Sequence, residues 1–252
     1  HLISNYKEAT LVPGSIEDRI HPFLAAVTMN SKILAIEDWH LPAKTSKGVR
    51  DRASYMFNLS EIEQNHPAKQ PLVSWGFHHY FHGKLTKNDL DEISSIRPII
   101  IIHRSFHEFI LNTPAMELLG INKEAFNEIP ELNHLANFDD GHFSERGAII
   151  VLPKLMQVLA SPMALIQGLQ KTRDYLHSNG ITLIGNPGSM YNKDLQTAKN
   201  LIFGNEDSPF ESYFFPSALN LSEQFKLDEV LDAAKDQTSW GEGKLNYLSK
   251  HI

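Results

Sequence analysis

Two segments that pair a capped helix with a short β-branched strand constrain this chain most. Residues 161–180 begin with Ser-Pro, keep apolar side chains at a helical period and end at Asn-Gly, which predicts a helix. The apolar run 181–184 follows at once and predicts a buried strand. A helix at 86–97 and a strand at 99–102 repeat the arrangement. Such alternation favours a mostly parallel sheet, either a barrel or an open doubly wound sheet.

The segment 105–178 is too long for a simple crossover between two strands, so we expect it to form a mostly helical insertion or subdomain. The other expected elements are strands at 10–16, 72–80 and 209–214 and helices at 23–36, 113–119 and 192–203.

Composition excludes several classes of function. The chain has 23 Lys and Arg against 30 Asp and Glu, a net charge of −7 with no basic stretch, so we expect no nucleic-acid partner. It has no cysteine, which excludes thiolate zinc sites and cysteine nucleophiles. The apolar runs are far shorter than the ~18 residues that cross a bilayer. We therefore expect a soluble, cytoplasmic protein with no membrane partner.

Histidine is the outlier, with 13 residues in the chain. Close groups of histidines suggest a metal, although single histidines are also common on surfaces and in loops. The spacing of His78, His79 and His82 suits a metal only on a helix, whereas the neighbouring aromatic residues favour a strand or an aromatic loop. We therefore give these three less weight than His103 and His107, which follow the strand at 99–102.

The end of the first expected strand offers a position for a metal. Residues i and i+2 of a strand lie on the same side, so two histidines spaced that way can hold one ion. Here these positions are Arg19 and His21. A guanidinium has no lone pair to give a cation, so Arg19 cannot be a ligand. His21 either binds a metal or is a strand-end histidine that hydrogen-bonds the backbone.

These motifs together resemble a known family of hydrolases. The segment 13–22 resembles the strand-one signature of the amidohydrolase superfamily, and it departs from that signature at Arg19, where the family has its first metal histidine. Later motifs resemble, in order, amidohydrolase family 3, which includes YtcJ-type hydrolases and N-substituted formamide deformylases. They are Leu85–Asp91, Arg97–Ile100, His103–His107, Asn112–Met116, Leu119–Ile121, Gly141–Glu145, Asn179–Thr182 and Pro209–Phe214.

The resemblance implies a fold, an activity and a set of site residues. The implied fold is a metal-dependent (β/α)8 TIM barrel with the inserted helical subdomain. Residues 1–252 would supply its first strands, without the β-sandwich or the C-terminal half of the barrel. The implied activity is hydrolysis of amide- or formamide-type C–N bonds in small molecules, with a divalent metal, zinc, as cofactor. His21 is the implied metal ligand, and His107, Asn112 and His103 are the expected substrate-binding residues.

Other functions stay open at this point. The chain is either the N-terminal part of such a hydrolase, inactive alone, or a degenerate relative that acts as a binding or interaction protein, which Arg19 favours. A complete enzyme of unrelated chemistry, using histidines between residues 78 and 107, is a third alternative. Half a barrel has open sheet edges, so we also expect self-association through them.

Overall fold

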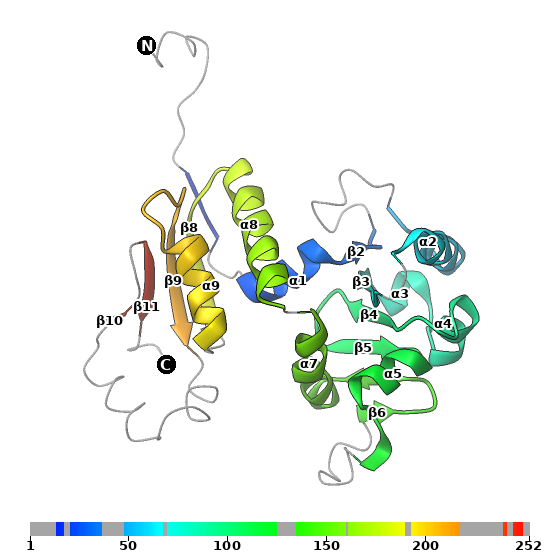
Figure 1. Ribbon diagram of the computed structural model, residues 1–252. Coiled ribbons are helices and arrows are strands. Elements are labelled where there is room, and N and C mark those ends of the chain that lie inside the picture. The colour runs from blue at the N-terminus through cyan, green and yellow to red at the C-terminus, as the bar shows by residue number, and fades with distance from the viewer. Residues whose placement is uncertain are drawn as a thin grey trace, which may run out of the picture. The chain divides into compact units, whose positions relative to one another are not determined.

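A computed structural model describes residues 14–17, 21–36, 48–67, 70–124, 135–159, 161–189, 193–216, 239–240 and 244–248. The chain divides into two compact units, each with its own sheet (Figure 1). We call Val27–Ala164 the inserted unit, and His1–Ala26 with Leu165–Ile252 the discontinuous unit. Helix α1 (Pro22–Asn30) contains the boundary between them.

The inserted unit has a six-stranded sheet in the order β2-β3-β4-β5-β7-β6. Strands β2, β3 and β4 are parallel, and β5, β7 and β6 continue the sheet with antiparallel pairing. The strands are β2 (Lys32–Ile33), β3 (Leu72–Phe77), β4 (Ile99–His103), β5 (Glu108–Leu111), β6 (Ala136–Asn137) and β7 (His142–Ser144). The helices are α2 (Arg52–Asn65), α3 (His79–His82), α4 (Lys87–Ile93), α5 (Thr113–Leu119) and α7 (Arg146–Leu159).

Both faces of the central strand β4 are buried. On β4, Ile99 and Ile101 belong to an apolar cluster with residues of α2 and α4, whereas Ile100 and Ile102 belong to a second cluster with residues of α5 and α7. All four isoleucines are at most 1% exposed. A run of consecutive apolar residues is typical of a strand covered on both sides, so the local sequence of β4 explains its central place.

The discontinuous unit has a five-stranded sheet in the order β1-β8-β9-β11-β10. The first four strands in that order are parallel and follow one another in chain order, and β10 pairs antiparallel with β11. The elements are β1 (Ser15–Glu17), α8 (Pro162–Ser178), β8 (Ile181–Ser189), α9 (Lys193–Phe203), β9 (Glu211–Pro216), β10 (Ser239–Trp240) and β11 (Leu245–Leu248). Its core combines Leu169 of α8, Phe203 of α9, Ile184 of β8 and Phe214 of β9.

The structure confirms the expected mixture of helices and parallel strands and changes several details. The described residues do not close a barrel; they form two open sheets. Within 105–178 the structure has the helices α5, α7 and α8, and the strands β5, β6 and β7, which pair into the same sheet as β3 and β4. The expected helix at 23–36 stops at Asn30 and gives way to β2. In the described part of the chain, no helix is both long and apolar enough to span a membrane.

A lysine lies in the core of the discontinuous unit. Lys199 of α9 is 1% exposed, and its ammonium nitrogen lies 4.6 Å from the ring centroid of Phe214. Burial lowers the pKa of Lys199 to about 7 from its ordinary value of 10.5. The charged form of this side chain therefore costs stability in the folded state.

We predict that the free energy of unfolding rises between about pH 7 and 10.5 because of Lys199. In this range the unfolded chain binds the proton that the folded chain has released, so raising the pH favours folding. Lys199→Met keeps the volume and removes the amine, and this part of the rise should disappear. Urea unfolding of both proteins at several pH values measures the difference. An unchanged rise in the variant would contradict the prediction.

Candidate metal centre

Three side chains from three elements of the inserted unit converge on one point. The Nε2 atoms of His79, on α3, and of His142, on β7, each lie 2.7 Å from Oε2 of Glu108, on β5. One ligand atom from each of these residues lies within 4.8 Å of the other two. No second group of three such residues with metal-binding spacing occurs in the described parts of the chain.

The pairing of the strands explains why Glu108 and His142 share a face. His142 is the register partner of Ile110, and Glu108 lies two residues before Ile110 on the same strand. Side chains two residues apart point to the same face, so both polar groups lie on the face that carries Ile110 and Ile101. On this face the paired residues Ile101 and Ile110 are apolar and belong to a buried cluster. The polar residues His103 and Glu108 lie next to them, at the ends of β4 and β5.

A glycine lets the chain reach His142 at this place. Gly141 has φ of 65°, and its backbone carbonyl accepts a hydrogen bond of 2.9 Å from the backbone N–H of Leu111. A Cβ at Gly141 would collide with the carbonyl oxygen of Leu111. The residue before His142 must therefore be glycine if β5 and β7 are to stay paired.

The third element, α3, differs from the sequence expectation. The segment 72–80 was expected to be a strand throughout, yet β3 ends at Phe77 and His79–His82 form a short helix. His78 caps that helix by accepting from the backbone N–H of Tyr80, and buried His82 contacts the carbonyl oxygen of Val49 through its ring. Of the three neighbouring histidines, His79 is the one that takes part in the cluster.

His103, at the end of β4, is buried and lies next to the cluster. Its Nε2 is 3.9 Å from Oε1 of Glu108, and its ring stacks on that of His79 with centroids 5.6 Å apart. Nδ1 of His103 accepts from the backbone N–H of Ser105. Burial, opposed by the Glu108 charge, lowers the pKa of His103 to about 4, so the ring is neutral at pH 7.

Glu108 is ionised at neutral pH despite its partial burial. Burial alone would raise the pKa of Glu108, but the hydrogen bonds with His79 and His142 and the nearby histidine charges hold it below its ordinary value. An anionic carboxylate between two imidazoles can do two things: accept hydrogen bonds from both rings, or bind a cation together with them.

His107, an expected substrate-binding residue, lies beside the cluster and outside it. Its side chain is 63% exposed, and its Nδ1 lies 3.1 Å from Oε2 of Glu145. Exposure leaves the ring able to meet a small molecule, so the proposed role of His107 stays a prediction.

The side chain of Asn112, another expected substrate-binding residue, is hydrogen-bonded to backbone groups of its own unit. It is fully buried and caps α5, and its Oδ1 accepts from the backbone N–H groups of Ile99 and Ala115. Its Nδ2 donates to the carbonyl oxygens of Ser94 and Arg97. All of these partners are backbone groups, so the side chain is committed to joining β4, α4 and α5.

His21, the expected metal ligand, belongs to the discontinuous unit and is exposed at the start of α1. Its Nδ1 lies 2.9 Å from Oδ1 of Asn186, a residue of β8 that is 3% exposed. Because an amide oxygen can only accept, Nδ1 of His21 carries the proton and Nε2 carries the lone pair. Arg19 lies outside the described residues.

Sequence reasoning missed Glu108 and the role of His142. Glu108 begins the otherwise apolar run Glu-Phe-Ile-Leu, and His142 directly follows Gly141. What the sequence lacked was the antiparallel register, because 34 residues separate the two positions. A strand prediction at 108–111 would have been the signal, since alternation then places Glu108 on the face opposite to Phe109.

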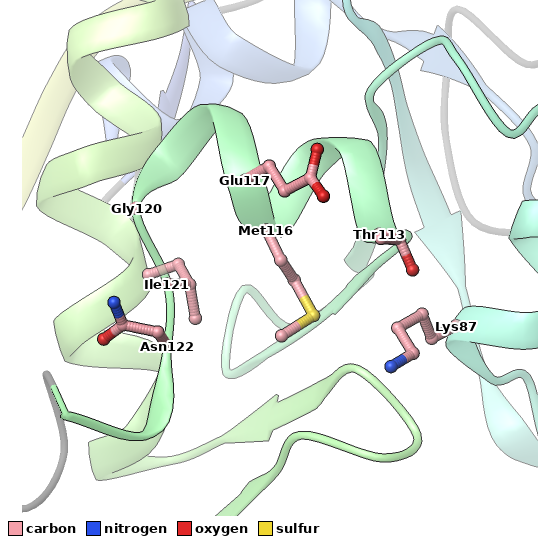
Figure 2. A pocket seen from close by; sticks show the side chains of 7 residues that line it. All are labelled: Lys87, Thr113, Met116, Glu117, Gly120, Ile121 and Asn122. Carbon is pink, nitrogen blue, oxygen red and sulfur yellow. The ribbon is translucent and has the colours of Figure 1, made fainter.

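A pocket of about 390 Å³ lies elsewhere in the inserted unit, between α4 and α5 (Figure 2). Figure 2 shows the thioether of Met116 between the side chains of Lys87 and Ile121. The amine of Lys87 donates to the carbonyl oxygen of Phe138, and the Thr113 hydroxyl donates to Asp91. These polar groups already have protein partners, and no residue of the histidine cluster lines this pocket.

Two solved structures share the fold. One is an uncharacterized metal-dependent hydrolase from Pyrococcus horikoshii OT3, with a TM-score of 0.61 and 12% identity over 94% of this chain and 42% of that one. The other is an uncharacterized metal-dependent hydrolase from Pyrococcus furiosus, with a TM-score of 0.59 and 15% identity over 93% of this chain and 42% of that one. The chain thus spans less than half the length of either structure. No family model and no curated protein matches the sequence.

We predict that Asn112→Ala lowers the free energy of unfolding by roughly 3–5 kcal/mol, because it leaves several buried backbone groups without partners. Urea unfolding measures this loss. Asn137→Ala is the matched control, since exposed Asn137 bonds only locally to Asp140 in the described contacts, and it should cost less than about 1 kcal/mol. Equal losses in the two variants would contradict a bracing role for Asn112.

Proposed function

We propose that this chain belongs to a metal-dependent hydrolase that cleaves amide- or formamide-type C–N bonds of small molecules. The fold it shares with two metal-dependent hydrolases supports the reaction class, and the resemblance of its motifs to amidohydrolase family 3 supports the bond type. We also propose that the parallel strands β1, β8, β9 and β11 are the first strands of a barrel.

The hydrogen bond between His21 and Asn186 is the observation that carries the proposal. His21 follows the carboxyl end of β1, and Asn186 lies in the carboxyl-terminal half of the neighbouring parallel strand β8. In parallel α/β folds this edge of the sheet holds the active site. A metal-binding histidine commonly donates its second ring N–H to a carbonyl oxygen, which fixes the ring and its tautomer. Asn186 provides such an acceptor.

The described residues supply His21 as one ligand, whereas a catalytic zinc site uses three protein ligands. We propose that the others come from outside the described residues, and we assign no further ligand here. When bound, a divalent ion supplies an activated water and polarises the carbonyl of the substrate. Asn186 orients the imidazole of His21.

Arg19 favours a second candidate function, a non-catalytic relative that binds a partner or a small molecule. A guanidinium offers no lone pair to a metal ion, and Arg19 stands in the sequence where the family that this segment resembles has its first metal histidine. Restoring a histidine at this position separates the two functions.

We predict that Arg19→His creates a zinc site with His21, tightening zinc binding at this place by at least roughly tenfold. The measurement is calorimetric titration of the chelator-stripped chain with zinc, together with hydrolysis of a panel of N-substituted formamides and N-acetyl amines. We expect the gain in zinc binding in Arg19→His and its loss in Arg19→His combined with His21→Gln.

The control is Arg19→Gln, which removes the positive charge without adding a ligand. A gain in zinc binding of the same size in this control would show that charge, and not ligation, is responsible. If Arg19→His binds no additional zinc, His21 is not at a ligand position and the non-catalytic function is favoured.

A further inference from the structure

We propose that the inserted unit binds a divalent transition-metal ion, zinc by its donor set, through His79, Glu108 and His142. The ligand atoms are Nε2 of each histidine and a carboxylate oxygen of Glu108. This site is separate from the ligand position at His21, and its existence does not depend on the proposed hydrolase function.

The donor set fits zinc. Two imidazole nitrogens and one carboxylate oxygen form a common three-ligand zinc set, which leaves a fourth position for water. With metal–ligand distances of ~2.0–2.2 Å in a tetrahedral arrangement, neighbouring donor atoms are roughly 3.3 Å apart. The two nitrogens each lie 2.7 Å from the same oxygen of Glu108. A small outward movement of each ring would therefore admit an ion.

The surroundings permit that movement and give an ion access. The side chains of His79 and His142 are 40% and 30% exposed, whereas Glu108 is 21% exposed. Glu108 is thus the more enclosed ligand, and the two rings cover it from α3 and β7. His103 is a positioning residue: its Nε2 faces the second carboxylate oxygen of Glu108 at 3.9 Å, and its Nδ1 is held by Ser105.

Backbone conformation beside the cluster gives a second observation. Phe106 and Glu145 have φ of 62° and 48°, the two positive values at non-glycine residues in the described chain. Phe106 lies two residues before Glu108, and Glu145 lies three residues after His142. Such conformations are costly in side-chain-bearing residues and concentrate at functional sites. Here Phe106 immediately precedes the approach to β5, and Glu145 directly follows β7, the two strands that carry Glu108 and His142.

Zinc binding to the full chain in a His21→Gln background tests the proposal, because this background removes the other proposed ligand. Calorimetric titration after chelator treatment should give one zinc per chain. Glu108→Gln and His142→Gln should each weaken binding at least roughly 100-fold, more than the 10–100-fold typical for loss of an outer-shell partner. Zinc at 100 times its dissociation constant should raise the Tm of the background protein by roughly 5–10 °C.

Two matched controls accompany these variants. Glu61→Gln removes an exposed carboxylate of α2, and His177→Gln removes an exposed histidine of α8; both should keep full zinc binding. X-ray absorption at the zinc edge supplies a measurement that needs no cluster variant. In the zinc-loaded background protein it should show imidazole scattering and nitrogen or oxygen neighbours at ~2.0–2.2 Å.

Three results would overturn the proposal. The first is no zinc binding in the His21→Gln background, which makes the cluster a hydrogen-bonded group only. The second is undiminished binding in Glu108→Gln, and the third is a zinc-edge spectrum without imidazole. The two proposals can fail separately. If Arg19→His gains zinc binding when His21 is present, and the His21→Gln background binds none, the proposed function stands and this inference fails.

Discussion

The carboxylate of Glu108 lies between two imidazoles at the end of a buried sheet face, where α3, β5 and β7 of the inserted unit meet. A half-buried anion is costly unless it has partners, and His79 and His142 provide them from α3 and β7. The contact thereby joins the helix after the parallel strand β3 to the antiparallel strands β5 and β7. It lies where isoleucines give way to polar side chains on one face of the sheet.

The two sheets place polar groups at strand ends by different means. In the inserted unit, the antiparallel return from β4 to β5 brings His103 and Glu108 to the same edge. In the discontinuous unit, two parallel strands bring His21 and Asn186 to the carboxyl edge of the sheet. Each unit therefore has its own candidate ligands, and the chemistry proposed for one does not require the other.

Local signals in the sequence determined most of the helices and the central strands. Thr86 and Asp89 form the reciprocal cap that opens α4, and Pro162 begins α8 as its sequence indicates. The run of isoleucines became β4, buried on both faces. These features depend on residues within a few positions of one another, where backbone preference and capping act, so they could be predicted without the fold.

Only the tertiary structure decided the register of the strands and the partners of polar side chains. The sequence drew attention to His103 and His107, but the structure joins Glu108 to His79 and His142, 29 and 34 residues away. Asn112 was expected to bind substrate, whereas its burial and its hydrogen bonds to four backbone groups depend on the packing of α4, β4 and α5 around it. Alternation fixes which residues share a face of one strand, whereas the pairing of strands distant in sequence fixes which faces meet.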